Sequence, residues 1–144
     1  MPDRSVVATF LGALLAAALA SSAATPIAAG AEKAPPAAVV AQLMTRDLIA
    51  GPDKEVSVLT VTYPPGGASL PHRHDAQVFV YVLEGELTMQ VRGSPAVTLR
   101  AGQTFYESPD DIHEVSANAS KTAPAKFLVV SIKDKAKPGM RPAD

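Results

Sequence analysis

The sequence predicts an all-β protein of one domain, built as an antiparallel sandwich or barrel. Three observations support this class: short strand-like segments recur along the chain, glycine- and proline-rich turns separate them, and no segment keeps a helical period. The chain has 144 residues, a length that suits a single domain. Many short strands joined by turns are typical of folds in which each strand presents one face to the core.

The first residues predict an export signal that precedes the fold. Arg4 and the amino terminus supply positive charge, residues 6–20 form an uncharged apolar run, and small residues in Ala-x-Ala spacing follow. The run is short and rich in alanine for a membrane-spanning helix, which needs about 20 strongly apolar residues. We therefore expect a signal peptide at 1–31, a flexible linker at 32–38, and a periplasmic or secreted protein in a bacterium. An uncleaved membrane anchor is the alternative.

Residues 39–132 hold the expected strands. Residues 56–63 alternate apolar and polar side chains as a half-buried strand should, and residues 39–49 could pair beside them. Residues 133–144 contain two prolines and a glycine, and we expect them to form a frayed polar tail. The other expected strands are, in order, 78–83, 87–91, 97–99, 103–107, 114–116 and 127–132.

Composition and charge exclude several classes of function. The chain has no cysteine, so disulfides, thiolate ligands and a cysteine nucleophile are all excluded. Its formal net charge is −1, and it has neither a basic stripe nor a recognition-helix pattern, so nucleic acid is not an expected partner.

All three histidines of the chain fall where they could bind a metal. His72 and His74 lie in the run Pro-His-Arg-His-Asp, and His113 ends the run Ser-Pro-Asp-Asp-Ile-His. Neutral imidazole is the commonest protein ligand for zinc, iron, copper and nickel. Two histidines spaced two apart on a strand point to the same face, because side chains alternate across the pleat. The alternative to a metal site is that His72 and His74 lie at a solvated strand start, that His113 is a loop histidine, and that none of them binds a metal.

The glycines and histidines together resemble the two sequence motifs of the cupin superfamily. The first motif, G(x)5HxH(x)3-4E(x)6G, ends on a strand-like segment, and the second, G(x)5PxG(x)2H(x)3N, follows after a short spacer. The matching residues are Gly66, His72, His74 and Gly85 in the first motif, and Gly102 and His113 in the second. Ser108 and Asp110 stand where the second motif has its proline and glycine, and Asn118 follows one residue later than the motif's asparagine. The resemblance implies a cupin jelly-roll antiparallel β-barrel in a single domain, with the three histidines converging on a metal.

The sequence departs from the family pattern at the expected glutamate ligand. Counting back from Gly85, this position holds Val78, and strand alternation turns its neighbour Gln77 away from the same face. Glu107 lies just before the turn that leads to His113, where alternation could aim it inward. Glu107 could serve as a fourth ligand, as a general base, or as an exposed carboxylate at a strand end.

The resemblance implies a metal-dependent function, with His72, His74 and His113 as ligands of a divalent iron, nickel, copper, zinc or manganese ion. Three protein ligands leave positions open for substrate, as in catalytic sites. Quercetin-dioxygenase-like cupins are most similar in motif arrangement, so we expect an oxygenase-like enzyme whose enol, catechol or carboxylate substrate chelates the metal. Glu107 or a bound water would take the proton.

Isomerase and decarboxylase chemistry remain alternatives within the enzyme class, and a non-catalytic cupin that binds a small ligand is the alternative outside it. Three neutral imidazoles would leave the full divalent charge on the metal, whereas a Glu107 ligand would lower it by one unit. The expected partners are a small-molecule ligand or substrate and a second copy of the chain in a homodimer, with no membrane partner after signal cleavage.

Overall fold

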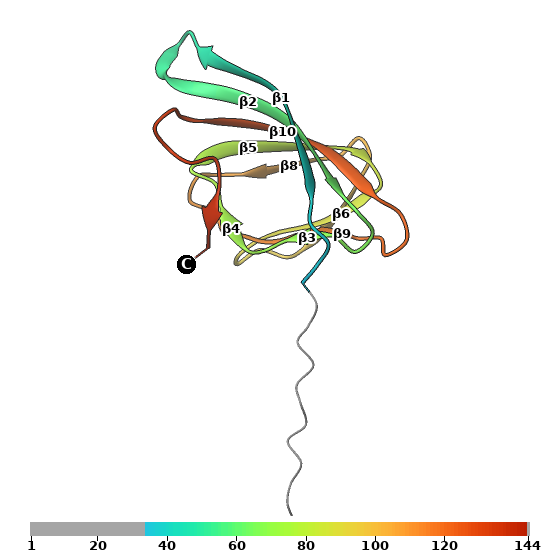
Figure 1. Ribbon diagram of the computed structural model, residues 1–144. Coiled ribbons are helices and arrows are strands. Elements are labelled where there is room, and N and C mark those ends of the chain that lie inside the picture. Colours follow the sequence, from blue (N-terminus) through green and yellow to red (C-terminus); the bar gives the residue numbers. More distant parts are fainter. Residues whose placement is uncertain (1–33, 144) are drawn as a thin grey trace, which may run out of the picture. The chain divides into compact units, whose positions relative to one another are not determined.

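Residues 34–143, which the computed structural model describes, form β-strands and no helix (Figure 1). None of these residues therefore forms a helix that could cross a membrane. The expected signal peptide and the start of the expected linker lie outside the described residues. The strands are β1 (Val39–Leu48), β2 (Gly51–Tyr63), β3 (Ala68–Ser69), β4 (His72–Arg73), β5 (Ala76–Glu84), β6 (Glu86–Val91), β7 (Val97–Arg100), β8 (Thr104–Glu107), β9 (His113–Asn118), β10 (Ala125–Asp134) and β11 (Arg141–Pro142).

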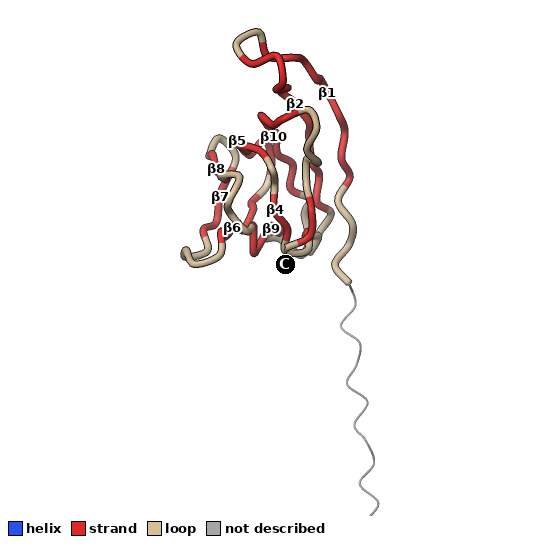
Figure 2. Tube along the Cα trace, turned by 90° about the vertical axis from the view of Figure 1, so that its left-hand side faces the viewer, coloured by secondary structure: helices blue, strands red, loops and turns tan. Residues whose placement is uncertain are grey.

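The strands form two antiparallel sheets, one above the other in Figure 1. One sheet has the order β1-β2-β10-β5-β8, and the other has the order β11-β4-β9-β6-β7 with β3 paired to β9. The β1–β2 hairpin projects beyond the other strands (Figure 2). The expected all-β, antiparallel jelly-roll architecture is confirmed.

The core lies between the sheets, where each long strand buries every second side chain. In β5, Val78, Val80 and Val82 are buried, whereas Phe79 and Tyr81 between them are exposed. The other buried apolar side chains come from both sheets: Val61, Tyr63, Ala76, Leu87, Met89, Leu99, Ala125, Phe127 and Val129. Strand alternation thus decides which aromatic residues of the sequence enter the core.

Each strand expected from the sequence is present, with bounds that differ by a few residues. The largest difference is β2, which begins at Gly51 instead of residue 56, and β1 pairs beside it as expected. Two short strands, β3 and β11, were not expected, and β4 is the short strand on which the sequence placed His72. A two-residue strand has no period to recognise in a sequence, because only its pairing with distant residues defines it.

Gly85 makes the tight connection from β5 in one sheet to β6 in the other. Its φ is +74°, in the left-handed region that glycine adopts at no steric cost. A Cβ atom at this position would lie 2.7 Å from the carbonyl oxygen of Pro124 and 3.0 Å from Cα of Ala125. A larger residue would therefore push apart the start of β10 and the β5–β6 connection.

The carboxyl-terminal segment is ordered against the sheet, which differs from the frayed tail expected for residues 133–144. Its first two residues complete β10, and Arg141–Pro142 forms β11 on β4. The Ala143 amide donates to the carbonyl of Pro71 at 3.2 Å, and Arg141 Nε lies 3.1 Å from Asp75 Oδ1. Polar composition favours fraying only where no partner strand is available, and here β4 provides one.

Candidate metal centre

The three histidines converge on one point because β4 and β9 are neighbouring strands. His72 pairs with His113 in the register of these strands, so both side chains project from the same face of the sheet. His74 lies just past the end of β4 and returns to that face after Arg73. The ring centroid of His72 lies 4.8 Å from that of His74 and 5.0 Å from that of His113.

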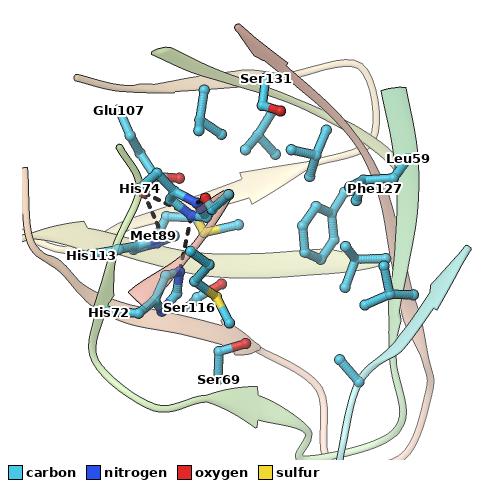
Figure 3. A pocket seen from close by; sticks show the side chains of 18 of the residues that line it. Leu59, Ser69, His72, His74, Met89, Glu107, His113, Ser116, Phe127 and Ser131 are labelled. Carbon is cyan, nitrogen blue, oxygen red and sulfur yellow. Dashed lines mark hydrogen bonds and ion pairs between the residues drawn. The ribbon is translucent and has the colours of Figure 1, made fainter. Parts of the chain in front are cut away.

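Backbone carbonyls assign the tautomers of two of these rings. His72 Nδ1 lies 2.7 Å from the Leu70 carbonyl oxygen, and His74 Nδ1 lies 2.8 Å from the Gly139 carbonyl oxygen. A carbonyl can only accept, so both Nδ1 atoms donate, and in the neutral rings both Nε2 atoms carry lone pairs. These two Nε2 atoms are 3.1 Å apart (Figure 3). Two lone pairs that face each other at this distance repel unless a cation lies between them.

Glu107 completes the cluster from the opposite sheet. Its side chain is 2% exposed, and its Oε2 atom lies 2.9 Å from His113 Nδ1 and 3.8 Å from His74 Nε2 (Figure 3). The hypothesis of an exposed carboxylate at a strand end is therefore wrong. Glu107 pairs with Val78 across β5 and β8, so its side chain leaves the sheet beside the position where the family pattern has its glutamate. Gln77 is exposed and faces away, which removes it as an alternative ligand.

The donor atoms of the cluster fit a divalent transition metal. One ligand atom from each of His72, His74, Glu107 and His113 can be chosen so that all four lie within 4.8 Å of one another. Ligands about 2.1 Å from an ion and at roughly right angles are about 3 Å apart, which matches the 3.1 Å and 2.9 Å separations. Neither ring nitrogen of His113 makes an aligned hydrogen bond in the described part of the chain, although Nδ1 lies 2.9 Å from Glu107 Oε2. A metal ion would satisfy one of them, because imidazole and carboxylate are common ligands of such ions.

Burial keeps His72 in the form that can bind a metal. It lowers the pKa of His72 below its ordinary value of 6.5, and the neighbouring imidazoles of His74 and His113 lower it further. The hydrogen bond to the Leu70 carbonyl acts in the opposite direction, but desolvation is the larger effect. The ring is therefore neutral at pH 7, with its Nε2 lone pair directed at the cluster.

The cluster lies at one side of an apolar cavity of about 410 Å³ between the sheets (Figure 3). This volume is within the range of about 300–1,000 Å³ typical of small-molecule sites. Leu59 and Phe127 lie on the opposite side of the cavity from the histidines (Figure 3). Ala38, from the expected linker, also lines it, so the end of that segment packs on the domain.

Sequence reasoning missed a hydroxyl network beside the cluster. The Tyr63 hydroxyl lies 2.6 Å from Ser69 Oγ and 2.8 Å from Ser116 Oγ, and all three residues line the cavity. In the sequence Tyr63 only ends a strand pattern, and the serines are ordinary loop or strand residues. Their proximity follows from the pairing of β3 with β9, for which the sequence holds no local signal.

Asn118, the last residue of the second motif, organises the loops around the site. Its side-chain amide donates to the carbonyls of Pro64 at 3.0 Å and Ala123 at 2.8 Å, and its Oδ1 atom accepts from the Ser120 amide at 2.9 Å. The backbone amide of Asn118 also donates to the Gly67 carbonyl at 2.8 Å. Asn118 therefore fixes the turn that leads into the histidine pair.

Fold and site together define a jelly-roll domain that can hold a metal ion in an apolar cavity. The family model described as the Cupin domain matches residues 59–131, about half of the chain. The chain therefore belongs to the cupin family, as its motifs indicated.

Solved structures of similar fold include several enzymes. An oxalate oxidase in complex with glycolate superposes with a TM-score of 0.55 at 29% identity, over 73% of this chain and 54% of that chain. The DMSP lyase DddQ from Ruegeria pomeroyi gives a TM-score of 0.58 at 19% identity, over 74% and 51%. A cupin-like protein from Thermotoga maritima gives 0.59 at 21% identity, over 74% and 75%.

The chain spans about half the length of the oxalate oxidase and the DMSP lyase. The two structures under 25% identity support the fold alone. No curated protein is significantly similar to this chain.

Proposed function

We propose that this cupin is a metal-dependent enzyme of the oxygenase type, whose small-molecule substrate chelates a metal held by His72, His74, His113 and Glu107. The observation that carries the proposal is the position of this cluster in the wall of an apolar cavity of about 410 Å³. The 29% identity with an oxalate oxidase supports oxidative chemistry over isomerisation or decarboxylation.

The protein residues divide the work in this proposal. A bound divalent metal would orient the oxygen atoms of the substrate and lower their pKa. The histidines donate their lone pairs, and the carbonyls of Leu70 and Gly139 keep two of the rings in the required tautomer. The apolar lining excludes water from the reacting atoms.

Glu107 has two roles in this proposal that one variant distinguishes. As a ligand it holds the metal and lowers the charge of the centre by one unit. As a general base it would take a proton from the substrate, which requires one of its oxygen atoms to lie within about 2.6–3.2 Å of the substrate atom that carries the proton. Glu107→Gln should reduce metal content in the first case, and turnover by about 10²–10⁴ with metal retained in the second.

A non-catalytic binding function is the second candidate, and one observation favours it. Among the described residues that line the cavity, the titratable side chains are the four of the cluster and Tyr63. If the whole cluster binds the metal, only Tyr63 is left to move a proton, and its hydroxyl is already paired with Ser69 and Ser116.

Oxygen uptake decides between the enzyme and the binding protein. Protein purified from its native compartment is first analysed for metal, and is then mixed with a panel of enols and catechols in an oxygen electrode. The enzyme proposal expects uptake that a chelator abolishes and added metal restores. Tight binding of a compound that is recovered unchanged, with no uptake for any member of the panel, would support the binding function instead.

Export and self-association are also part of the proposal. Size-exclusion chromatography with light scattering should find a homodimer, because β1 is an edge strand with exposed apolar side chains on both of its faces, including Val39, Val40, Leu43 and Met44. A monomer at micromolar concentration would contradict it.

Amino-terminal sequencing of the exported protein tests whether cleavage falls near residue 31.

A further inference from the structure

We infer that the cavity takes a singly charged oxygen chelator with an apolar body, and that it selects against small dianions. This inference rests on the proposed metal site, and it names the class of ligand that the site accepts. Its support comes from the arrangement of the cavity wall, the charge of the cluster and the pairing of the remaining polar groups.

The register of the strands arranges one wall of the cavity into rows of side chains. Residues paired across β2, β10, β5 and β8 project together, and successive rows on the same face are about 7 Å apart, because each residue advances a strand by about 3.4 Å. Among the residues that line the cavity, the first row holds Ser57, Ser131, Val78 and Glu107, the second holds Leu59, Val129 and Val80, and the third holds Val61 and Phe127. The two rows beyond that of Glu107 are therefore wholly apolar, and the farther one lies about 14 Å from the row of Glu107.

The charges of the cavity suit one negative charge on the ligand. Ligation requires neutral imidazoles and an ionised carboxylate. A divalent ion bound by His72, His74, His113 and Glu107 thus retains one positive charge. No lysine or arginine is among the described residues that line the cavity. A singly charged chelator neutralises the centre, whereas a dianion leaves one negative charge buried without a partner, which is costly in an apolar site.

Most polar groups elsewhere in the cavity already have hydrogen-bond partners and need none from the ligand. The hydroxyls of Tyr63, Ser69 and Ser116 pair with one another, so an apolar ligand leaves none of them without a partner. The Ser131 hydroxyl lies in the same row as Glu107, where the charged end of the ligand would be. The ligand is therefore expected to direct its oxygen atoms to the cluster and its apolar body toward Leu59 and Phe127.

Three probes test this inference on the protein under anaerobic conditions. The protein is loaded with zinc, because zinc has no redox chemistry and the probes are then bound without being oxidised. Isothermal titration calorimetry measures the affinities of catechol, 4-tert-butylcatechol and oxalate. Catechol and its tert-butyl derivative share a chelating group that carries one negative charge once it has lost one proton, and they differ only in apolar bulk. We expect the derivative to bind at least about tenfold more tightly, which is less than the full transfer of four carbon atoms from water would provide. Oxalate should bind at least about tenfold more weakly than catechol.

Two variants locate the effect in the second row. Leu59→Phe fills space among the apolar rows and should reduce the gain from the tert-butyl group to less than about threefold. Val58→Phe introduces the same side chain on the opposite face of β2, where residue 58 pairs with Val130 and Met44, and should leave the gain unchanged. Should Leu59→Phe fail to fold, Val129→Leu makes a smaller change in the same row and should lower the gain in the same direction.

The outcomes separate this inference from the metal site on which it rests. Equal affinities for the two catechols, or oxalate bound as tightly as catechol, would overturn the ligand class while leaving the metal site intact. A protein that retains no zinc after dialysis would overturn the proposed function as well, because no probe could then chelate at the cluster.

Discussion

The replacement Glu107→Gln removes the charge of the buried carboxylate and keeps its shape. Glu107 is 2% exposed, and its Oε2 atom lies within 4 Å of nitrogen atoms of His74 and His113. An amide is a poorer ligand, so we expect metal affinity to fall by about 10–100-fold, the range found when groups around a metal are changed. Among the described residues, the side chains within ion-pair distance of Glu107 are the imidazoles of His74 and His113, which a glutamine amide can also contact, so the substitution should cost little in the metal-free protein.

The change in affinity translates into a change in thermal stability. Metal at 100 times its Kd stabilises the folded protein by about 2.7 kcal/mol, and a Kd that is 10–100 times weaker leaves about 1.4–0.4 kcal/mol at the same metal concentration. The loss is therefore about 1.3–2.3 kcal/mol. For a domain of this size each kcal/mol corresponds to roughly 4 °C in Tm, so the rise in Tm on metal addition should shrink by about 5–10 °C.

Differential scanning calorimetry with and without metal measures this quantity directly, and competition with a chelator measures Kd independently. Glu84→Gln is the matched control, because Glu84 is an exposed carboxylate at the end of β5 in the same sheet as Glu107. The reasoning is refuted if Glu107→Gln keeps both the Kd and the full rise in Tm, because Glu107 would then not be a ligand.

Three further predictions concern the same site. Val78→Glu combined with Glu107→Val should restore metal affinity to within about tenfold of the natural protein in chelator competition, because the two positions face each other across β5 and β8; no recovery over Glu107→Val alone would show that only β8 can supply the carboxylate. Burial lowers the pKa of His72, so the unfolded chain takes up more protons than the folded one as the pH falls below about 6.5. The contribution of His72 to the stability of the metal-free protein should be fully present above this pH and be lost as the pH falls through the folded-state pKa; a Tm that rises on acidification would contradict this. Deletion of residues 139–144 removes the Gly139 carbonyl that accepts from His74 Nδ1. Metal affinity should fall by about 10–100-fold while the circular dichroism spectrum stays unchanged; an unaltered affinity would show that this hydrogen bond does not orient the ring.

The parts of this molecule that were predictable from sequence are those with a local pattern. The alternation of residues 56–63 indicates which face of that strand is buried, whereas the apolar run of residues 78–83 predicts a strand without showing which face is buried. The histidines were found because their spacing in the chain matches a motif. The cupin jelly roll follows from the same two signals, and the structure and the family match confirm it.

The parts that were not predictable depend on pairing between distant segments. Glu107 had three hypothetical roles because its burial depends on β8 pairing with β5 opposite Val78, which no local pattern records. The Gly139 carbonyl gave no signal at all, because every residue has a carbonyl group and only the pairing of β11 with β4 brings this one to His74. Composition predicted a frayed tail for the same reason.

The cluster takes its ligands from both sheets, with three histidines from one and Glu107 from the other. The complete site therefore forms only when the two sheets have docked, late in folding, because contacts between distant segments must first overcome the entropy of closing long loops. A partly folded chain offers at most an incomplete set of ligands and holds metal weakly. The metal supply of the compartment where the chain completes its folding would then decide which ion the site takes up.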